Sequence, residues 1–370
     1  MSLNRKKILI GFLNKDVKGA IPTVTKAFIE GLADKYDFIP FYMDRLISKK
    51  HTKMNLINIF YFFKHYISWI YHIIRYRPDI VHYPVTSYWN SEKSLLFLFT
   101  AKLLLVKKNV GHLHGGAYDS FWASLHPIRK KFNLFMLCNL DAFVVLSEFW
   151  REVAINKIGL KESKVFLVNN PISRDVEDHF IEHIRNYKSG DTVNVVSIGA
   201  VTERKGIMDT IEALKSINNI KYTYSIIGNV IEEAFREKIL LFLKENEMLD
   251  RVKLLGPKYN KDKIDILEKA DIFILASHIE NFPLVVIEAA SAGLAIIATP
   301  IGALPEFFKH GENIYFVEQE NVHQLMQGIE QLANDDAERE KLGKNAREIF
   351  CEKLNRVKIM KQLEAVYDKI

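Results

Sequence analysis

The chain holds 370 residues, of which 48% are hydrophobic, and carries a formal net charge of +6 at pH 7. This length exceeds one ordinary hydrophobic core and predicts two domains, while the apolar content excludes a disordered chain. The charge suits an anionic ligand or membrane surface, and no basic and aromatic cluster matches a nucleic-acid-binding module. Cys138 and Cys351 match no metal-binding spacing, so we expect buried packing thiols in a reducing, cytoplasmic compartment.

Short apolar runs alternate with longer helical patterns along the chain, as is typical of parallel βαβ units. We expect a first strand, and no signal peptide, at the opening apolar run, which Asn14 breaks. Strands are predicted at residues 7–13, 38–43, 79–84, 109–115, 141–147 and 165–170, and again at 193–200, 221–228, 251–256, 271–277, 295–300 and 314–317. The polar stretch 171–192 separates the two series and is predicted to hold the domain boundary. The pattern predicts an α/β fold with two doubly wound domains and closing helices, the last over about 351–369.

Residues 45–78 are rich in aromatic and basic side chains and contain no acidic residue. Polar interruptions such as Lys64 argue against a membrane-spanning helix. Two interpretations remain open. One is a long amphipathic helix whose aromatic side chains pack on the first sheet. The other places one helix face on an anionic leaflet, with attraction supplied by Lys49, Lys50 and Lys53.

Two glutamates, Glu280 and Glu288, bracket a mostly apolar run. Pro283 suits the first turn of a helix and Gly293 suits a C-terminal stop, so a short helix is predicted between them. Glu280 follows the buried strand "ADIFILAS" and therefore lies at the carboxyl end of a strand, where open α/β sheets bind ligands. Glu288 lies about one and a half turns into the helix, so both carboxylates are predicted to reach the same crevice.

The second half resembles the donor-binding domain of retaining GT-B glycosyltransferases, in the large family called glycosyl transferases group 1, family four. The resemblance covers nearly all of residues 193–350 and rests on "SIGAVTERKG", "SIIGN", "LLGPKYNKDKIDILEKADIFILAS" and "HIENFPLVVIEAASAGLAIIATPIGALPEFF". In the first half, "YRPDIVHYP", "NVGHLHGG" and "DAFVVLSEFWREV" are more weakly similar to the acceptor domain. The family fold implies two Rossmann-like domains facing a cleft: acceptor-binding over 1–175, donor-binding over 190–350, and a C-terminal helix, 351–370, that crosses back to the first domain.

The resemblance implies that a nucleotide-sugar is the substrate and that no cofactor takes part. The leaving diphosphate gains charge as the sugar departs, so its site needs cations and backbone N–H groups. Lys205 is expected to contact the diphosphate, Glu280 the donor sugar near its reaction centre, and Glu288 the ribose hydroxyls. The further donor-binding candidates are Gly19, Gly199, Arg204, Asn281, Phe282 and Leu284. Arg204 is included because Ala200 stands where the family usually has an arginine.

His114, before two glycines at the carboxyl end of a strand, is the catalytic candidate in the first half, where the resemblance places it near the sugar or acceptor. His112 is expected to turn to the opposite face and to be a packing residue.

The sequence contains no Asp-x-Asp, so no metal is expected at the diphosphate. The resemblance implies retention of configuration and transfer to a hydroxyl of a glycan or lipid-linked acceptor, in cell-envelope polysaccharide synthesis at the inner face of the membrane. A dehydrogenase is disfavoured because G-x-G-x-x-G is absent. Two alternatives stay open: a nucleotide-sugar epimerase of the same fold, and a non-catalytic homologue that acts as a binding partner.

Overall fold

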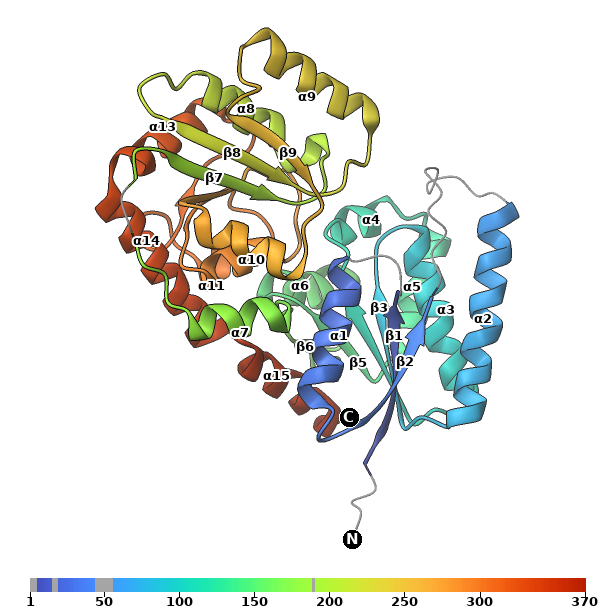
Figure 1. Ribbon diagram of the computed structural model, residues 1–370. Helices are drawn as coiled ribbons and strands as arrows, with labels where there is room; N and C mark the ends of the chain where they lie inside the picture. Colours follow the sequence, from blue (N-terminus) through green and yellow to red (C-terminus); the bar gives the residue numbers. More distant parts are fainter. Residues whose placement is uncertain (1–4, 15–18, 44–55, 188–189) are drawn as a thin grey trace. The chain divides into compact units, whose positions relative to one another are not determined.

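The protein consists of two α/β units in the computed structural model, which describes residues 5–14, 19–43, 56–187 and 190–370 (Figure 1). One unit comprises Met1–Pro171 together with Arg356–Ile370, and the other comprises Ile172–Asn355. Each contains a six-stranded sheet whose paired strands are parallel. Every predicted strand has a counterpart, and the predicted pair of doubly wound domains is confirmed.

The first unit has the strand order β2-β1-β3-β4-β5-β6. Its strands are β1 (Lys7–Leu13), β2 (Asp37–Tyr42), β3 (Ile80–Val85), β4 (Lys108–Leu113), β5 (Ala142–Val145) and β6 (Val165–Leu167). The central strand β3, with the sequence IVHYPV, is buried along its whole length, as expected when helices cover both faces of a parallel sheet.

Helices cover the two faces of this sheet in two different groups. Its helices are α1 (Ala20–Leu32), α2 (Leu56–Tyr76), α3 (Trp89–Leu103), α4 (Tyr118–Ser124), α5 (Pro127–Cys138), α6 (Glu148–Glu152) with a π-helical extension (Val153–Ile158), a 3₁₀ turn (Glu162–Lys164) and α15 (Arg356–Lys369). His82 of β3 contacts α1 and α15, whereas its neighbour Tyr83 packs on Trp69 of α2. Because successive strand residues point to opposite faces, α1 and α15 cover one face and α2 lies on the other, together with α3 and α5.

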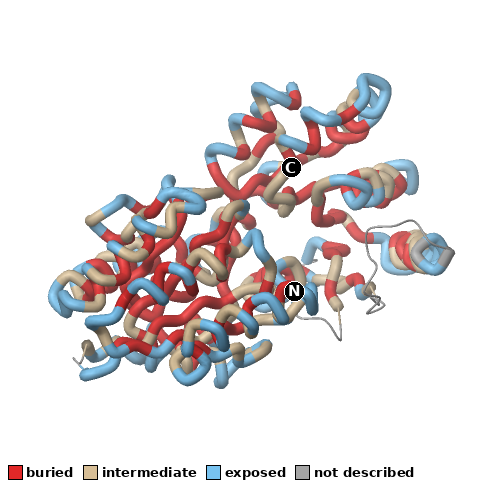
Figure 2. The backbone as a smooth tube through the Cα atoms, turned by 90° about the horizontal axis from the view of Figure 1, so that it is seen from above, coloured by how far each residue is buried: buried red, intermediate tan, exposed pale blue. Residues whose placement is uncertain are grey.

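The second unit has the strand order β12-β11-β10-β7-β8-β9. Its strands are β7 (Val193–Ile198), β8 (Tyr222–Ile227), β9 (Val252–Gly256), β10 (Ile272–Leu275), β11 (Ala295–Ala298) and β12 (Tyr315–Phe316). Its helices are α7 (Arg174–Glu182), α8 (Ile207–Lys215) after a 3₁₀ turn (Glu203–Lys205), α9 (Glu233–Glu245), α10 (Asn260–Lys269), α11 (Leu284–Ser291), α12 (Leu304–Phe307), α13 (Val322–Asn334) and α14 (Asp336–Ile349) with a π-helical extension (Phe350–Leu354). In Figure 2 the buried residues, in red, gather in the interior of each unit, and the exposed residues, in pale blue, lie on its outer turns.

The short helix predicted between Pro283 and Gly293 is present as α11, and Gly293 has the left-handed φ of 69° that suits a helix stop. The helix predicted within 45–78 is present as α2. Its predicted basic residues Lys49, Lys50 and Lys53 lie outside the described residues.

Two details differ from the sequence-based expectations. Cys138 and Cys351 are exposed, so the prediction that both are buried packing thiols is wrong. Both stand at the ends of helical segments, on turns that face outward, where the apolar neighbours rather than the cysteines fill the core. The last helix begins at Arg356 rather than near residue 351, because the chain turns to an extended conformation at Asn355.

Candidate functional site

The candidate site lies at the carboxyl edge of the second sheet, where the strand order reverses. From β7 the chain winds outward through β8 and β9, then returns to β10 on the other side of β7. Gly199 directly follows β7, and Glu280 lies in the loop after β10. Open α/β sheets bind ligands at such a reversal, because the loops after the two neighbouring strands diverge there.

Lys205 and Glu280 form an ion pair at this reversal. Their side chains are only 13% and 14% exposed, so water screens the pair less than it screens a surface pair. Ser277 donates a second hydrogen bond to the same Glu280 oxygen, with 3.2 Å between the oxygen atoms. The Lys205 side chain passes over Gly199, and with Ala200 these two residues line a small cavity. Two predicted catalytic residues of the second half therefore meet in one place.

Two glycines allow the loops around this pair to approach closely. A Cβ atom on Gly206 would lie 1.9 Å from the carbonyl oxygen of Ala276, and one on Gly302 would lie 2.3 Å from that of Asn281. Both glycines also have left-handed φ angles, 63° and 57°. Any side chain at either position would push the loop that carries Glu280 away from its neighbours.

Arg204 holds the same loop through its main chain and its side chain. Its carbonyl accepts a 2.8 Å hydrogen bond from the N–H of His278, and its guanidinium donates to the carbonyl of Ile279 at 3.2 Å. The main chain of Arg204 thus holds His278 and its side chain holds Ile279, the two residues directly before Glu280. Its expected role as a substitute for the arginine missing at Ala200 stays a prediction.

Glu288 is a buried carboxylate on α11, with 4% of the residue exposed. One of its oxygens lies 2.5 Å from the Nζ atom of Lys263 on α10. The other oxygen has no hydrogen-bond partner among the described residues. A buried carboxylate oxygen without a partner is costly, so this atom is suited to accept a hydrogen bond from a bound hydroxyl group.

Asn281 carries further unpaired polar atoms next to Glu280. The residue is 7% exposed, and neither its amide oxygen nor its amide nitrogen has a partner in the described structure. Its neighbour Phe282 is buried against Phe307, with 6.1 Å between ring centroids, and Leu284 begins α11. The side chain of Phe282 therefore packs in the core and leaves only its backbone for the predicted donor contact.

Sequence reasoning did not identify Lys263, which neutralises Glu288. Its position in the sequence could have indicated that it lies near the site. Helix α10 begins shortly after β9, on the same edge of the sheet, and Lys263 is in its first turns. Its pairing with Glu288, 25 residues away in the chain, depends on how α10 packs on the sheet and is not visible in a local pattern.

The candidate residue of the first unit, His114, lies at the carboxyl end of β4, and its N–H donates to the carbonyl of Val85 at 2.8 Å. Its ring centroid lies 4.3 Å from that of His112, so the prediction that His112 points to the opposite face is wrong. Residues two apart in a strand share a face, which is the physical reason for this correction. His112 is buried, as a packing residue should be.

The two histidines continue into a hydrogen-bonded chain that sequence reasoning missed. His82 lies 3.1 Å from His112 through its Nε2 atom and 2.5 Å from the hydroxyl of Tyr367 through its Nδ1 atom. Burial lowers the pKa of His82 to about 3 and that of His112 well below its ordinary value. Both rings are therefore neutral at pH 7, with α15 supplying the tyrosine that ends the chain.

Gly19, the candidate in the loop after β1, is the exposed N-cap residue of α1, and its backbone is extended. Most of the loop expected to close over the donor phosphates, residues 15–18, lies outside the described residues. The role of Gly19 therefore stays a prediction.

Comparisons with known proteins identify relatives of both halves of the chain. The model for glycosyl transferases group 1 matches residues 180–349, and the model for glycosyltransferase family 4 matches residues 33–176. An uncharacterized glycosyltransferase, MJ1178 of Methanocaldococcus jannaschii, is 28% identical over 184 residues, which are 50% of each chain. The capsular polysaccharide biosynthesis glycosyltransferase CapM of Staphylococcus aureus is 25% identical over 243 residues, 63% of this chain and 62% of that protein. The chain thus spans between half and two thirds of the length of these relatives.

Solved structures show the same fold at greater sequence distance. A glycosyltransferase from Rickettsia africae superposes with a TM-score of 0.78 at 19% identity over 99% of each chain. Anabaena Alr3699/HepE, in complex with UDP and glucose, superposes with a TM-score of 0.74 at 14% identity, over 99% of this chain and 100% of its own. The fold of this chain, with its two Rossmann-like domains, is the GT-B fold. The chain belongs to the group 1 family of glycosyl transferases.

Among the described helices, none combines the length and the apolar character needed to cross a membrane.

Proposed function

We propose that the protein is a retaining glycosyltransferase that moves a sugar from a nucleotide-sugar donor to a hydroxyl group of a glycan or lipid-linked acceptor. The donor would bind at the carboxyl edge of the second sheet. The acceptor would be bound by the first unit, with His114 as the group nearest the sugar or acceptor. Family membership supports transfer of a sugar, and CapM connects such a transfer with capsular polysaccharide.

The main support for the proposal is a set of buried polar atoms that lack hydrogen-bond partners and lie close in sequence to the carboxylate that pairs with Lys205. The Asn281 amide and one Glu288 oxygen are buried without partners in the described structure, close in sequence to Glu280, which pairs with Lys205. A nucleotide-sugar offers complementary groups: hydroxyl donors on the sugar and ribose, and an anionic diphosphate. HepE, which has the same fold, was crystallised with UDP and glucose, and this supports the same class of ligand here.

In the proposed reaction the bond between the sugar C1 atom and the diphosphate oxygen breaks, and a bond between C1 and the acceptor oxygen forms on the same face. The proton of the acceptor hydroxyl passes to the departing phosphate oxygen. Lys205 would stabilise the growing charge of the diphosphate, and Glu280 would hold both Lys205 and the donor sugar in place. No metal ion is assigned, because the fixed cation and backbone N–H groups would do this work.

We further propose that the protein acts in cell-envelope polysaccharide synthesis at the inner face of the cell membrane, with an anionic membrane surface as a partner. An epimerase of the same fold, and a non-catalytic homologue, are the alternatives that the first experiment must separate. The replacement of the usual family arginine by Ala200 is the feature that keeps the second alternative open.

The experiment is a panel of UDP-, GDP- and ADP-sugars, assayed for binding by thermal shift and for slow hydrolysis by product analysis. We expect one nucleotide series to bind best and its sugar to be released slowly. Release of a sugar with inverted configuration at C2 would support an epimerase. Binding without any turnover, also after addition of glycan acceptors, would support a non-catalytic homologue.

A further inference from the structure

The outer helical layer of the first unit exposes many large apolar side chains. In this layer α3 lies between α2 and α5 and packs against both (Figure 1). The exposed residues are Phe60, Phe63, Ile67, Tyr71 and Ile74 of α2, Leu103, Leu104 and Leu105 at and after the end of α3, and Ile128, Phe132 and Phe135 of α5. We call this set the outer apolar face.

On α2 the exposed residues form a single stripe along the helix. Phe60, Phe63, Ile67, Tyr71 and Ile74 follow one another at intervals of three and four residues, so they share one side of the helix. Trp69 and Ile73, on the other side, are buried in the core of the unit. The helix is thus apolar on both sides, and packing on the sheet explains only one of them.

The leucines after α3 are more unusual than scattered surface residues. Leu103, Leu104 and Leu105 are three consecutive exposed leucines, and Leu105 is 89% exposed. Leu105 also has a φ of 63°, a backbone conformation that is unfavourable for a residue with a side chain. A run of exposed apolar residues is a liability in water unless it has a binding role.

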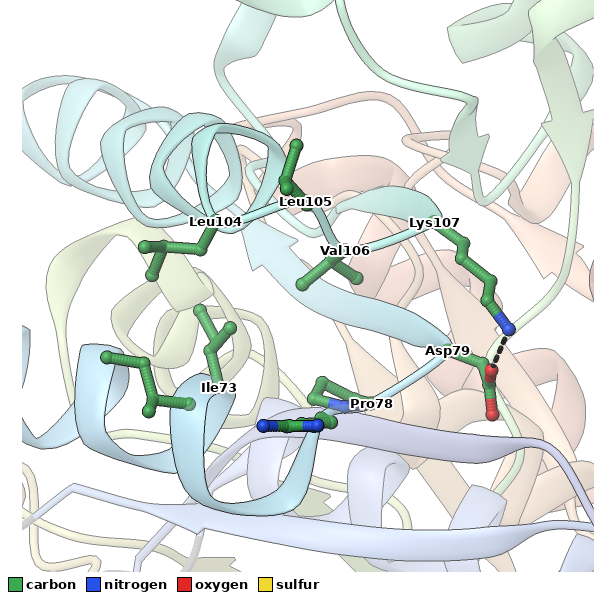
Figure 3. Close-up of a pocket in the computed structure, with 9 residues that line it drawn as sticks. Ile73, Pro78, Asp79, Leu104, Leu105, Val106 and Lys107 are labelled. Atoms are coloured by element: carbon green, nitrogen blue, oxygen red, sulfur yellow. Dashed lines mark hydrogen bonds and ion pairs between the residues drawn. The ribbon is translucent and has the colours of Figure 1, made fainter.

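A hollow of about 470 Å³ joins the two groups. It is lined by Ile73 and Ile74 at the end of α2 and by Leu104 and Leu105 after α3 (Figure 3). Lys107, which also lines the hollow, lies 2.7 Å from Asp79, as the dashed line in Figure 3 marks. The stripe of α2 and the leucines therefore border one continuous depression.

The charges around the outer apolar face are almost all positive. The basic residues of α2, α3 and α5 are Lys64, Arg75, Lys93, Lys102, Arg129, Lys130 and Lys131, and the one acidic residue of these helices is Glu92. Glu92 is paired with Arg129. The opposite face of the sheet is more mixed, because α1 and α15 carry three acids, Glu30, Glu364 and Asp368, beside five basic residues.

We propose that the outer apolar face binds the interfacial region of an anionic lipid bilayer. The stripe of α2 would lie in the plane of the membrane, and Leu103 and Leu105 would enter the boundary between headgroups and acyl chains. Aromatic and aliphatic side chains framed by lysine and arginine are the combination that suits this region, and each basic residue near it increases binding roughly fivefold. A second copy of the chain is a poorer occupant, because two such faces would bring like charges together.

This inference extends the proposed function by naming the membrane surface that would present a lipid-linked acceptor. The link with the acceptor rests on that function, whereas binding to the bilayer does not. The two can therefore fail separately.

The test is co-sedimentation of the full chain with vesicles of phosphatidylcholine alone or mixed with phosphatidylglycerol, at low and high salt. We expect sedimentation with the anionic vesicles at low salt and its loss at high salt. Equal recovery in the supernatant with both kinds of vesicle at low salt would overturn the proposal.

Two variants address the two components of the surface. Phe63→Ser with Ile67→Ser removes part of the stripe and should weaken binding about a hundredfold. Lys130→Gln with Lys131→Gln should weaken it roughly tenfold or more. The matched control is Leu241→Ser with Lys244→Gln on α9 of the other unit, where Leu241 is also exposed, and it should bind as the wild type does. Wild-type binding by both test variants would overturn the assignment of the surface.

Two further measurements on the same preparations separate the outcomes. Light scattering reports the mass in solution: a dimer that the Phe63 and Ile67 changes dissociate, without vesicle binding, would show a contact between copies and overturn the proposal. Thermal shift with the best nucleoside diphosphate should be unchanged in every variant. Vesicle binding without any nucleotide response would leave the surface supported and count against the proposed function alone.

Discussion

Lys205 and Glu280, 75 residues apart in the chain, form a largely buried ion pair at the point where the second sheet reverses its strand order. The pair joins the cation expected at the donor diphosphate to the carboxylate expected at the donor sugar. Glu280 thus orients Lys205 before any ligand arrives. The cation is fixed in place rather than recruited during the reaction, which is the condition under which electrostatic stabilisation is most effective.

Lys205→Ala should lower the rate of sugar transfer roughly a hundredfold or more, because about 3 kcal/mol of stabilisation of the leaving diphosphate is lost. The steady-state rate with the best donor of the panel measures this. Lys238→Ala, which breaks an exposed ion pair with Glu203, is the matched control and should leave the rate unchanged. Near-normal turnover of the Lys205 variant would show that the cation is not catalytic.

Glu280→Gln should also lower the rate of transfer roughly a hundredfold or more, but it should leave binding of the nucleoside diphosphate intact or stronger, since Lys205 is then free for the phosphates. The measurements are the rate and the dissociation constant of the nucleotide. Removing one partner of a buried pair also costs stability, so the double variant Lys205→Met with Glu280→Gln serves as a folding control. A loss of nucleotide affinity as large as the loss of rate would contradict the assigned role.

Glu288→Ala should weaken binding of the nucleoside diphosphate, because its unpaired oxygen is expected to accept a ribose hydroxyl. Loss of a hydrogen bond to a charged group costs about 1.5–3 kcal/mol, or roughly 10- to 150-fold in affinity. The sharper measurement compares the nucleotide with its 2′,3′-dideoxy analogue. The wild type should prefer the ribonucleotide, and the variant should not. An unchanged preference in the variant would place the ribose elsewhere.

Activity should be largely unchanged by EDTA, since the sequence lacks Asp-x-Asp and Lys205 is placed to neutralise the diphosphate. The check is the transfer rate after chelation and dialysis. Complete loss of activity, restored by added Mn²⁺, would mean that the phosphate site has been misidentified.

Acid should destabilise the first unit through its buried histidines. Burial lowers the pKa of His82 from its ordinary 6.5 to about 3, so the unfolded state binds more protons between these values. Stability is therefore lost as pH falls below about 6.5, by about 2 kcal/mol per such histidine at pH 5. Urea unfolding at several pH values measures this. His82→Gln should flatten the pH dependence, whereas His323→Gln, at an exposed position, should not. If stability depended equally on pH in both variants, His82 would not be the cause of the acid destabilisation.

The apolar runs predicted the strands because a strand buried on both faces leaves a continuous local signal. Pro283 and Gly293 likewise predicted the bounds of α11, since both act on the backbone at their own position. Ion pairs such as that of Lys263 with Glu288 could not be predicted from the sequence, because they depend on which helices pack side by side. The exposure of Cys138 and Cys351 was missed for the same reason, as burial depends on the side of a helical segment that faces the sheet.

The hydrogen-bonded series of Tyr367, His82 and His112 likewise could not be predicted from local sequence, because its members are far apart in the polypeptide. His82 and Tyr367 are 285 residues apart and meet only because α15 packs on the first sheet. A local pattern could nonetheless have placed His112 correctly. Residues two apart in a strand share a face, and this rule alone puts His112 beside His114.

The most direct test is time-resolved proton NMR of the wild-type protein with the nucleotide-sugar that binds best. An α-linked donor should yield the free nucleoside diphosphate together with the α-anomer of the sugar before mutarotation, and Lys205→Ala should slow this release roughly a hundredfold or more. First appearance of the β-anomer would contradict retention. Absence of any release, with and without glycan acceptors, from a protein that binds the donor would contradict the proposal that it is a glycosyltransferase.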